Sequence, residues 1–123
     1  MILVYDKTQA HKPIMSEVLT ELTAILEQRK SASAADSYVA SLHEKGLNKI
    51  LEKIGEEATE TILAAKECEH AGGLAKEAVI KETADLWFHT MVMLSHLGLS
   101  SDQVLEELEK RFNISGLEEK ASR

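Results

Sequence analysis

Apolar residues recur along most of this chain at roughly every third or fourth position, with polar and charged residues between them. That spacing is typical of amphipathic helices, because an α-helix completes a turn in about 3.6 residues. Small residues or glycines interrupt the pattern four times, and such residues commonly separate helices. The pattern predicts helices over residues 16–30, from Tyr38 to about Gly46, over 47–70, over 74–96, and from a cap at 100–102 to Phe112.

Helix-breaking residues are rare, since the chain holds only 6 glycines and 1 proline among 123 residues. We therefore expect an all-α fold, a helical bundle of four to five helices with short connections. The length suits one domain, residues 1–123, with its core at about residues 16–112. Residues 1–13 are assigned no role, and we expect the polar tail from Asn113 to fray.

The helix predicted over 74–96 is unusually apolar. Its segment Leu-Trp-Phe-His-Thr-Met-Val-Met-Leu, residues 86–94, has only His89 and Thr90 as polar members. A helix that is apolar nearly all round is buried on nearly all sides. In a chain of this size a second subunit is the natural source of that cover, so we predict a homodimer.

Charge and composition exclude several classes of function. The formal net charge is -7 and the isoelectric point about 5.2, which argues against binding to nucleic acid. No apolar run approaches the roughly 20 residues of a membrane span, so no membrane association is predicted. The single cysteine excludes a disulfide framework and a cysteine-rich zinc site. A cytoplasmic protein is the expectation.

Two segments carry closely spaced acidic residues, Gly-Glu-Glu-Ala-Thr-Glu at 55–60 and Glu-Thr-Ala-Asp at 82–85. At about 100° per residue, Glu82, Asp85 and His89 share one narrow stripe of an otherwise apolar helix. On the preceding helix, Glu57 falls on the same face as Ile50. Glu60 borders that face, and Glu56 lies one step further round.

Carboxylates that meet in a bundle interior need compensation, because removing an ion from water costs several kcal/mol. Lys53 and His89 are able to offset two of the five carboxylate charges in these two segments. A hard cation such as Mg²⁺ prefers oxygen ligands and is able to gather the remainder. The pattern therefore favours a divalent metal site between two helices over an ordinary solvated acidic face.

The Glu-Glu-x-x-Glu run followed by Glu-x-x-Asp resembles the all-α nucleoside triphosphate pyrophosphatases, the MazG-like superfamily. The surrounding sequence is similar to one family within that fold, phosphoribosyl-ATP pyrophosphatase of histidine biosynthesis. The segments that carry this likeness are SYVASLHEKGLNKILEKIGEEATETILAAK and KETADLWFHTMVML. The likeness extends from about Val18 to about Phe112 and so covers most of the chain.

The resemblance implies a Mg²⁺-dependent hydrolase that assembles as a helical dimer. Its reaction would split N1-(5-phosphoribosyl)-ATP into phosphoribosyl-AMP and pyrophosphate, the second step of histidine biosynthesis. The metal ligands of the superfamily correspond here to Glu57, Glu60, Glu82 and Asp85. Glu56 is similar to the position that orients or deprotonates water, and we take it as the candidate catalytic base.

Three further side chains are candidates for supporting roles. Lys49 and Lys53 lie on one side of their helix, a turn apart, and either contact substrate phosphates or pair with nearby glutamates. His89 follows Asp85 by one turn and either supports a carboxylate from behind or is a core histidine with satisfied hydrogen bonds. Tyr38 either contacts substrate or packs, and the sequence does not decide between these roles.

Three other functions stay open on the sequence alone. A house-cleaning nucleoside triphosphate pyrophosphatase would have the same fold and metal site with a different nucleotide. A di-iron carboxylate bundle needs two Glu-x-x-His motifs, and only Glu67 with His70 fits. A non-enzymatic helical dimerisation module would leave the Glu82–Asp85 pair unexplained and would show no Mg²⁺-dependent change in melting temperature.

Overall fold

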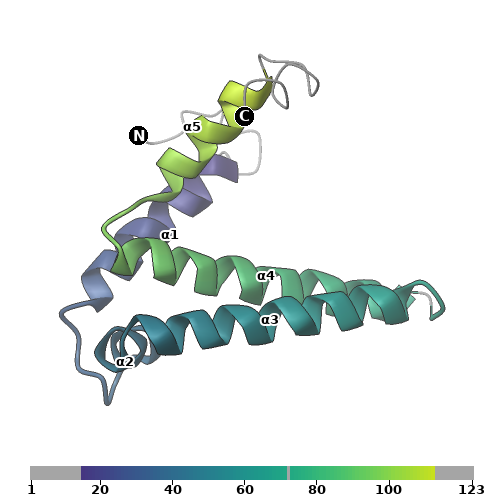
Figure 1. Ribbon diagram of the computed structural model, residues 1–123, viewed down its shortest axis with the longest axis horizontal. Coiled ribbons are helices and arrows are strands. Elements are labelled where there is room, and N and C mark those ends of the chain that lie inside the picture. The colour runs from purple at the N-terminus through teal and green to yellow at the C-terminus, as the bar shows by residue number, and fades with distance from the viewer. Residues whose placement is uncertain (1–14, 72, 113–123) are drawn as a thin grey trace, which may run out of the picture.

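The computed structural model describes residues 15–71 and 73–112 of the chain. These residues form helices and no strand, so the all-α prediction is confirmed, and each helix lies within about two residues of its predicted bounds. The expectations for residues 1–13 and for the tail from Asn113 lie outside the described residues. The helices are α1 (Met15–Arg29), α2 (Tyr38–Lys45), α3 (Leu47–Cys68), α4 (Gly73–His96) and α5 (Ser101–Phe112) (Figure 1).

The two longest helices, α3 and α4, form an antiparallel hairpin (Figure 1). They pack against each other more extensively than any other pair of described helices. Helices joined by a short connection become antiparallel neighbours, which follows here from the few residues between Cys68 and Gly73. α1 and α2 pack on this hairpin, whereas α5 packs chiefly on α1.

Short-range caps hold α2 beside the start of α3. The Ser37 side chain accepts a hydrogen bond from the Ala40 backbone N–H at 3.1 Å, which satisfies a donor at the start of α2. Gly46 ends α2 with a φ of 97°, a conformation that residues with a Cβ rarely adopt. This glycine lets the chain turn from α2 directly into α3.

The hydrophobic core lies at the end of the hairpin that α1 and α2 cover. Its members are buried and come from α1, α2, α3 and α4: Leu26, Val39, Leu42, Ile50, Met91 and Val92. Towards the other end of the hairpin, Ile62, Leu63 and Ile80 are 67%, 63% and 68% exposed. One chain therefore covers only part of the hairpin's apolar surface.

Two histidines join α2 to α4 near this core. His43 Nδ1 lies 2.9 Å from His96 Nδ1, and the two rings are stacked with an interplanar angle of 13°. Burial lowers the pKa of His43, the charges of His96 and Lys30 act in the same direction, and Glu27 opposes them. The members of this pair are 53 positions apart, and helical periodicity did not predict their contact.

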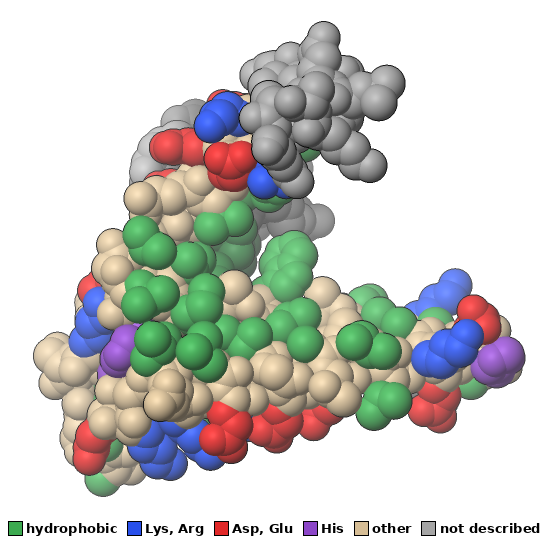
Figure 2. Space-filling model, viewed as in Figure 1, with side chains coloured by type: hydrophobic (Ala, Val, Ile, Leu, Met, Phe, Trp, Pro, Cys, Tyr) green, Lys and Arg blue, Asp and Glu red, His purple; other side chains and the backbone are tan. Residues whose placement is uncertain are grey.

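An apolar groove lies between α4 and α5, with Leu19 of α1 also in its lining. Its volume is about 440 Å³, and its walls include Trp87 and Met91 on α4 and Val104 and Leu108 on α5. Hydrophobic side chains gather in this angle between the hairpin and α5, whereas acidic side chains follow one edge of the hairpin (Figure 2). Trp87 is 59% exposed, so a single chain does not bury α4 on all sides.

Among the described residues, no helix is both long enough and apolar enough to cross a membrane.

Candidate functional site

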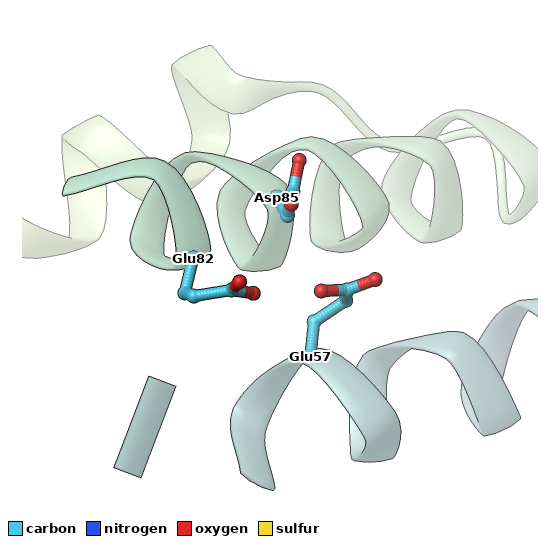
Figure 3. Close-up of side chains that lie close together, drawn as sticks. All are labelled: Glu57, Glu82 and Asp85. Atoms are coloured by element: carbon cyan, nitrogen blue, oxygen red, sulfur yellow. The ribbon is translucent and has the colours of Figure 1, made fainter. Parts of the chain in front are cut away.

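Carboxylates from both helices of the hairpin converge near its middle. Glu57 projects from α3 and Glu82 reaches towards it from α4, with Asp85 about one turn further along α4 (Figure 3). One carboxylate oxygen from each of the three lies within 4.8 Å of the other two. This group, which we call the acidic cluster, is the only set of three or more potential metal ligands of this kind among the described residues.

The local sequence explains how Glu57 reaches the interior. Ile50 is completely buried, and Glu57 follows it by seven residues, about two helical turns, on the same face of α3. Glu57 is accordingly only 7% exposed. The structure therefore confirms the predicted inward position of Glu57.

The cluster becomes more open from α3 towards α4. Glu57 is buried, Glu82 is half-buried and Asp85 is exposed, so Asp85 is more accessible than a buried stripe would suggest. Glu57 Oε2 and Glu82 Oε2 are both buried without a hydrogen-bond partner. An unpartnered buried polar atom costs about 1–3 kcal/mol, and more when it belongs to a charged group.

Like charges and burial raise the pKa values of two carboxylates of the cluster. Burial raises the pKa of Glu57, and the neighbouring carboxylates of Glu60 and Asp85 raise it further. The pKa of Glu82 is raised chiefly by its hydrogen bond with Glu60, then by burial and by the other acids. Bringing these carboxylates together is therefore unfavourable unless protons or cations are shared among them.

Glu60 lies at the edge of the acidic cluster. Its side chain is exposed, and it is close enough to hydrogen-bond with both Glu57 and Glu82. The structure thus brings all four predicted ligands into one neighbourhood, with three of them in mutual contact range.

The two candidate lysines differ in their partners. Lys53 Nζ lies 3.3 Å from Glu56 Oε1 and 3.8 Å from Glu57 Oε1, so it bridges the exposed Glu56 and the buried cluster. Lys49 Nζ instead pairs with Glu52 at 3.1 Å. Glu56 itself is exposed and lies outside the acidic cluster. Lys53 is therefore better placed than Lys49 to meet a ligand at the cluster.

His89 is buried, with both ring nitrogens engaged. Its Nδ1 lies 2.8 Å from the backbone carbonyl oxygen of Asp85, and its Nε2 lies 2.8 Å from the Tyr38 hydroxyl. Neither partner is a carboxylate, so His89 contacts the main chain of Asp85 rather than its side chain, and its supporting role stays a prediction. The sequence left the role of Tyr38 undecided, and the structure places its hydroxyl in contact with His89, next to the cluster.

The donor set fits a hard divalent cation. It offers only carboxylate oxygens, the ligands that Mg²⁺ prefers, and two of them are buried without partners. Asp85 is exposed, so the group is accessible to solvent on the α4 side. Histidine and cysteine ligands, which softer metals favour, do not belong to this group.

The sequence model of a family described as phosphoribosyl-ATP pyrophosphohydrolase matches residues 19–112. The matched segment begins within α1, ends with α5, and contains every residue of the acidic cluster.

Proposed function

The chain belongs to the phosphoribosyl-ATP pyrophosphohydrolase family, and we propose that its hydrolysis of phosphoribosyl-ATP depends on Mg²⁺ held at the acidic cluster. A member of this family is a hydrolase that releases pyrophosphate and acts in histidine biosynthesis. The observation that carries the proposal is the convergence of three carboxylates from two helices, with two buried oxygens that lack partners.

Electrostatics makes a cation necessary at this site. A triphosphate brings several negative charges towards side chains that are themselves acidic, and the repulsion prevents binding unless positive charge stands between them. When bound, Mg²⁺ supplies that charge and lowers the pKa of a coordinated water. Glu57, Glu60, Glu82 and Asp85 would hold it, with the exposed Asp85 on the side from which substrate arrives.

The remaining groups have distinct tasks in the proposed reaction. Water adds to phosphorus at the α–β linkage, the bridging P–O bond breaks, and pyrophosphate leaves. Glu56 accepts the proton of the attacking water, because its exposed carboxylate lies beside the cluster without belonging to it. Lys53 turns from Glu56 and Glu57 to a phosphate oxygen when substrate binds, and Lys49 has a smaller share in the same task.

We propose further that two copies of the chain pair through the apolar groove. Trp87 both lines the groove and stands 59% exposed, so one patch offers a cavity and a protruding side chain. A two-fold interface requires such self-complementarity, because the same surface meets itself.

The deciding assay is pyrophosphate release from phosphoribosyl-ATP with Mg²⁺ and with EDTA. We expect activity only with Mg²⁺, and we expect Glu82→Gln and Asp85→Asn to abolish it while the far-ultraviolet circular dichroism stays helical. Glu106→Gln, which removes an exposed carboxylate on α5, is the matched control and should keep full activity. Near wild-type turnover of either cluster variant, or full activity in EDTA, would refute the metal assignment.

The role of Glu56 needs a separate measurement, because loss of a catalytic base and loss of a metal ligand affect kcat and Mg²⁺ affinity differently. Glu56→Gln should lower kcat much more than it lowers Mg²⁺ affinity, since it removes a proton acceptor and leaves the cluster intact. An equal loss of both would make Glu56 a metal ligand instead.

A further inference from the structure

A chain of two hydrogen bonds connects α2 to the main chain of Asp85, a member of the acidic cluster. The Tyr38 hydroxyl lies 2.8 Å from His89 Nε2, and His89 Nδ1 lies 2.8 Å from the backbone oxygen of Asp85. Tyr38 is the first residue of α2, and His89 and Asp85 are one turn apart on α4. The chain therefore joins the start of α2 to the turn of α4 that presents Asp85 to the cluster.

The identities of the partners fix where the protons lie. A backbone carbonyl oxygen has no proton to give, so His89 Nδ1 carries the hydrogen of that bond. In the neutral ring, Nε2 then has a lone pair and accepts from the Tyr38 hydroxyl. Because the Tyr38 proton is committed to His89, its oxygen is left as an acceptor for any other group nearby.

Tyr38 also faces the charged side of α3. Burial raises the pKa of its hydroxyl, the carboxylates of Glu57 and Glu56 raise it further, and Lys53 lowers it. Tyr38 is bonded to His89, which contacts the main chain of Asp85, and yet Tyr38 is 51% exposed. A residue needed only to fill the core would be less exposed than this.

We propose that Tyr38 is a positioning residue of the metal site, which acts through His89 to hold the turn of α4 that carries Asp85 at its working distance from Glu57. The edge-to-face contact of the Tyr38 and His89 rings, at 85°, supports the same arrangement. Asp85 is the exposed member of the cluster and lacks the burial that restrains Glu57. Its position thus depends on the main chain of α4, which is where His89 attaches.

This inference rests on the proposed function, and its consequence is specific. A positioning residue that sets carboxylate spacing affects metal affinity and kcat, whereas a residue that contacts substrate affects KM. Loss of one hydrogen bond of this kind corresponds to about a tenfold change in an equilibrium or rate constant.

The test is Tyr38→Phe, which keeps the ring and removes only the hydroxyl. We expect a fall of about tenfold in kcat, a several-fold weaker Mg²⁺ affinity measured without substrate, and little change in KM. The ¹⁵N spectrum of His89 should keep a protonated Nδ1 and show Nε2 shifted by loss of its donor. Thr90→Val is the matched control, because it removes a hydroxyl on the next residue that bonds to the Leu86 carbonyl.

A double-mutant cycle establishes whether Tyr38 acts through His89. In a His89→Gln background, Tyr38→Phe should cause no further loss of Mg²⁺ affinity or kcat, since the connection is already cut. Additive losses would overturn the proposal, as would unchanged Mg²⁺ affinity and kcat in Tyr38→Phe itself. Mg²⁺ affinity and the His89 spectrum do not require turnover, so they test this inference even if the wild-type protein proves inactive and the proposed function fails.

Discussion

The acidic cluster should make the metal-free protein less stable than a variant that lacks one of its charges. Glu57→Gln is the most informative change, because Glu57 is 7% exposed and its Oε2 has no hydrogen-bond partner. The substitution preserves the shape of the side chain and removes the ionised group that burial and the neighbouring acids disfavour. We therefore expect this loss-of-function substitution to stabilise the fold when EDTA is present.

The magnitude follows from the buried oxygen and its ion pair. Leaving a buried polar atom unpartnered costs about 1–3 kcal/mol, and part of that cost remains with the amide. The Lys53–Glu57 pair at 3.8 Å is lost, but a partly exposed pair contributes at most about 1 kcal/mol. A net gain of about 1 kcal/mol in the free energy of unfolding remains, which corresponds to roughly 4–8 °C in Tm for a small domain.

The direction of the pH dependence provides an independent check. The folded-state pKa of Glu57 is raised above its usual value of 4.5. Its favourable contribution is therefore complete below pH 4.5 and is lost as pH rises through the folded pKa. The stability advantage of Glu57→Gln in EDTA should accordingly be present at pH 7.5 and shrink as the pH approaches 4.5.

The assay is thermal and urea unfolding of both proteins, in EDTA and over a Mg²⁺ titration. Mg²⁺ should raise the Tm of the wild-type protein, because at a hundredfold excess over Kd it adds about 2.7 kcal/mol to the free energy of unfolding. The Tm of Glu57→Gln should barely change. Glu106→Gln should behave as the wild type does. If Glu57→Gln is less stable than the wild type in EDTA, or gains as much from Mg²⁺, then the carboxylates do not repel one another and do not share a cation.

Three further predictions concern other parts of the molecule. Lys53→Ala should raise KM for phosphoribosyl-ATP by about tenfold, and Lys49→Ala should raise it by much less, because of the two only Lys53 reaches the cluster. Equal effects of the two variants on KM in steady-state kinetics would contradict this. Stability should fall as pH drops below 6.5, because burial holds the pKa of His43 below that value, and His43→Gln should lose less than the wild type does between pH 7.5 and 5.5 in urea titrations. Trp87→Glu should convert a dimer to a monomer in size-exclusion chromatography with light scattering, whereas a wild-type monomer would exclude the proposed pairing.

Periodicity predicted the features that depend on neighbours along the chain. Helix bounds follow from spacing and from breaks such as Gly46, and the burial of Glu57 follows from its register with Ile50. The same reasoning placed Asp85 on a buried stripe, but the structure leaves it exposed. A helical wheel gives the direction of a side chain and contains no information on how far the neighbouring helix covers it.

Contacts between distant positions were beyond prediction from one sequence. Tyr38 and His89 are 51 positions apart, and each has an ordinary interpretation on its own. The same applies to His43 and His96, whose pairing depends on how α2 crosses the end of α4. Their partners are set by tertiary packing, which periodicity along one helix does not report.

The hairpin origin of the cluster has a consequence for how the protein unfolds. Both walls of the site come from consecutive helices, so a bound ion would link two segments that are already near neighbours along the chain. Such short-range contacts form quickly, because little loop entropy is lost in closing them. A bound ion would thus stabilise one local folding unit, the α3–α4 hairpin. The rate at which α3 opens from α4, measured by amide hydrogen exchange, would then depend on Mg²⁺ concentration. Exchange at the end covered by α1 and α2 would respond less.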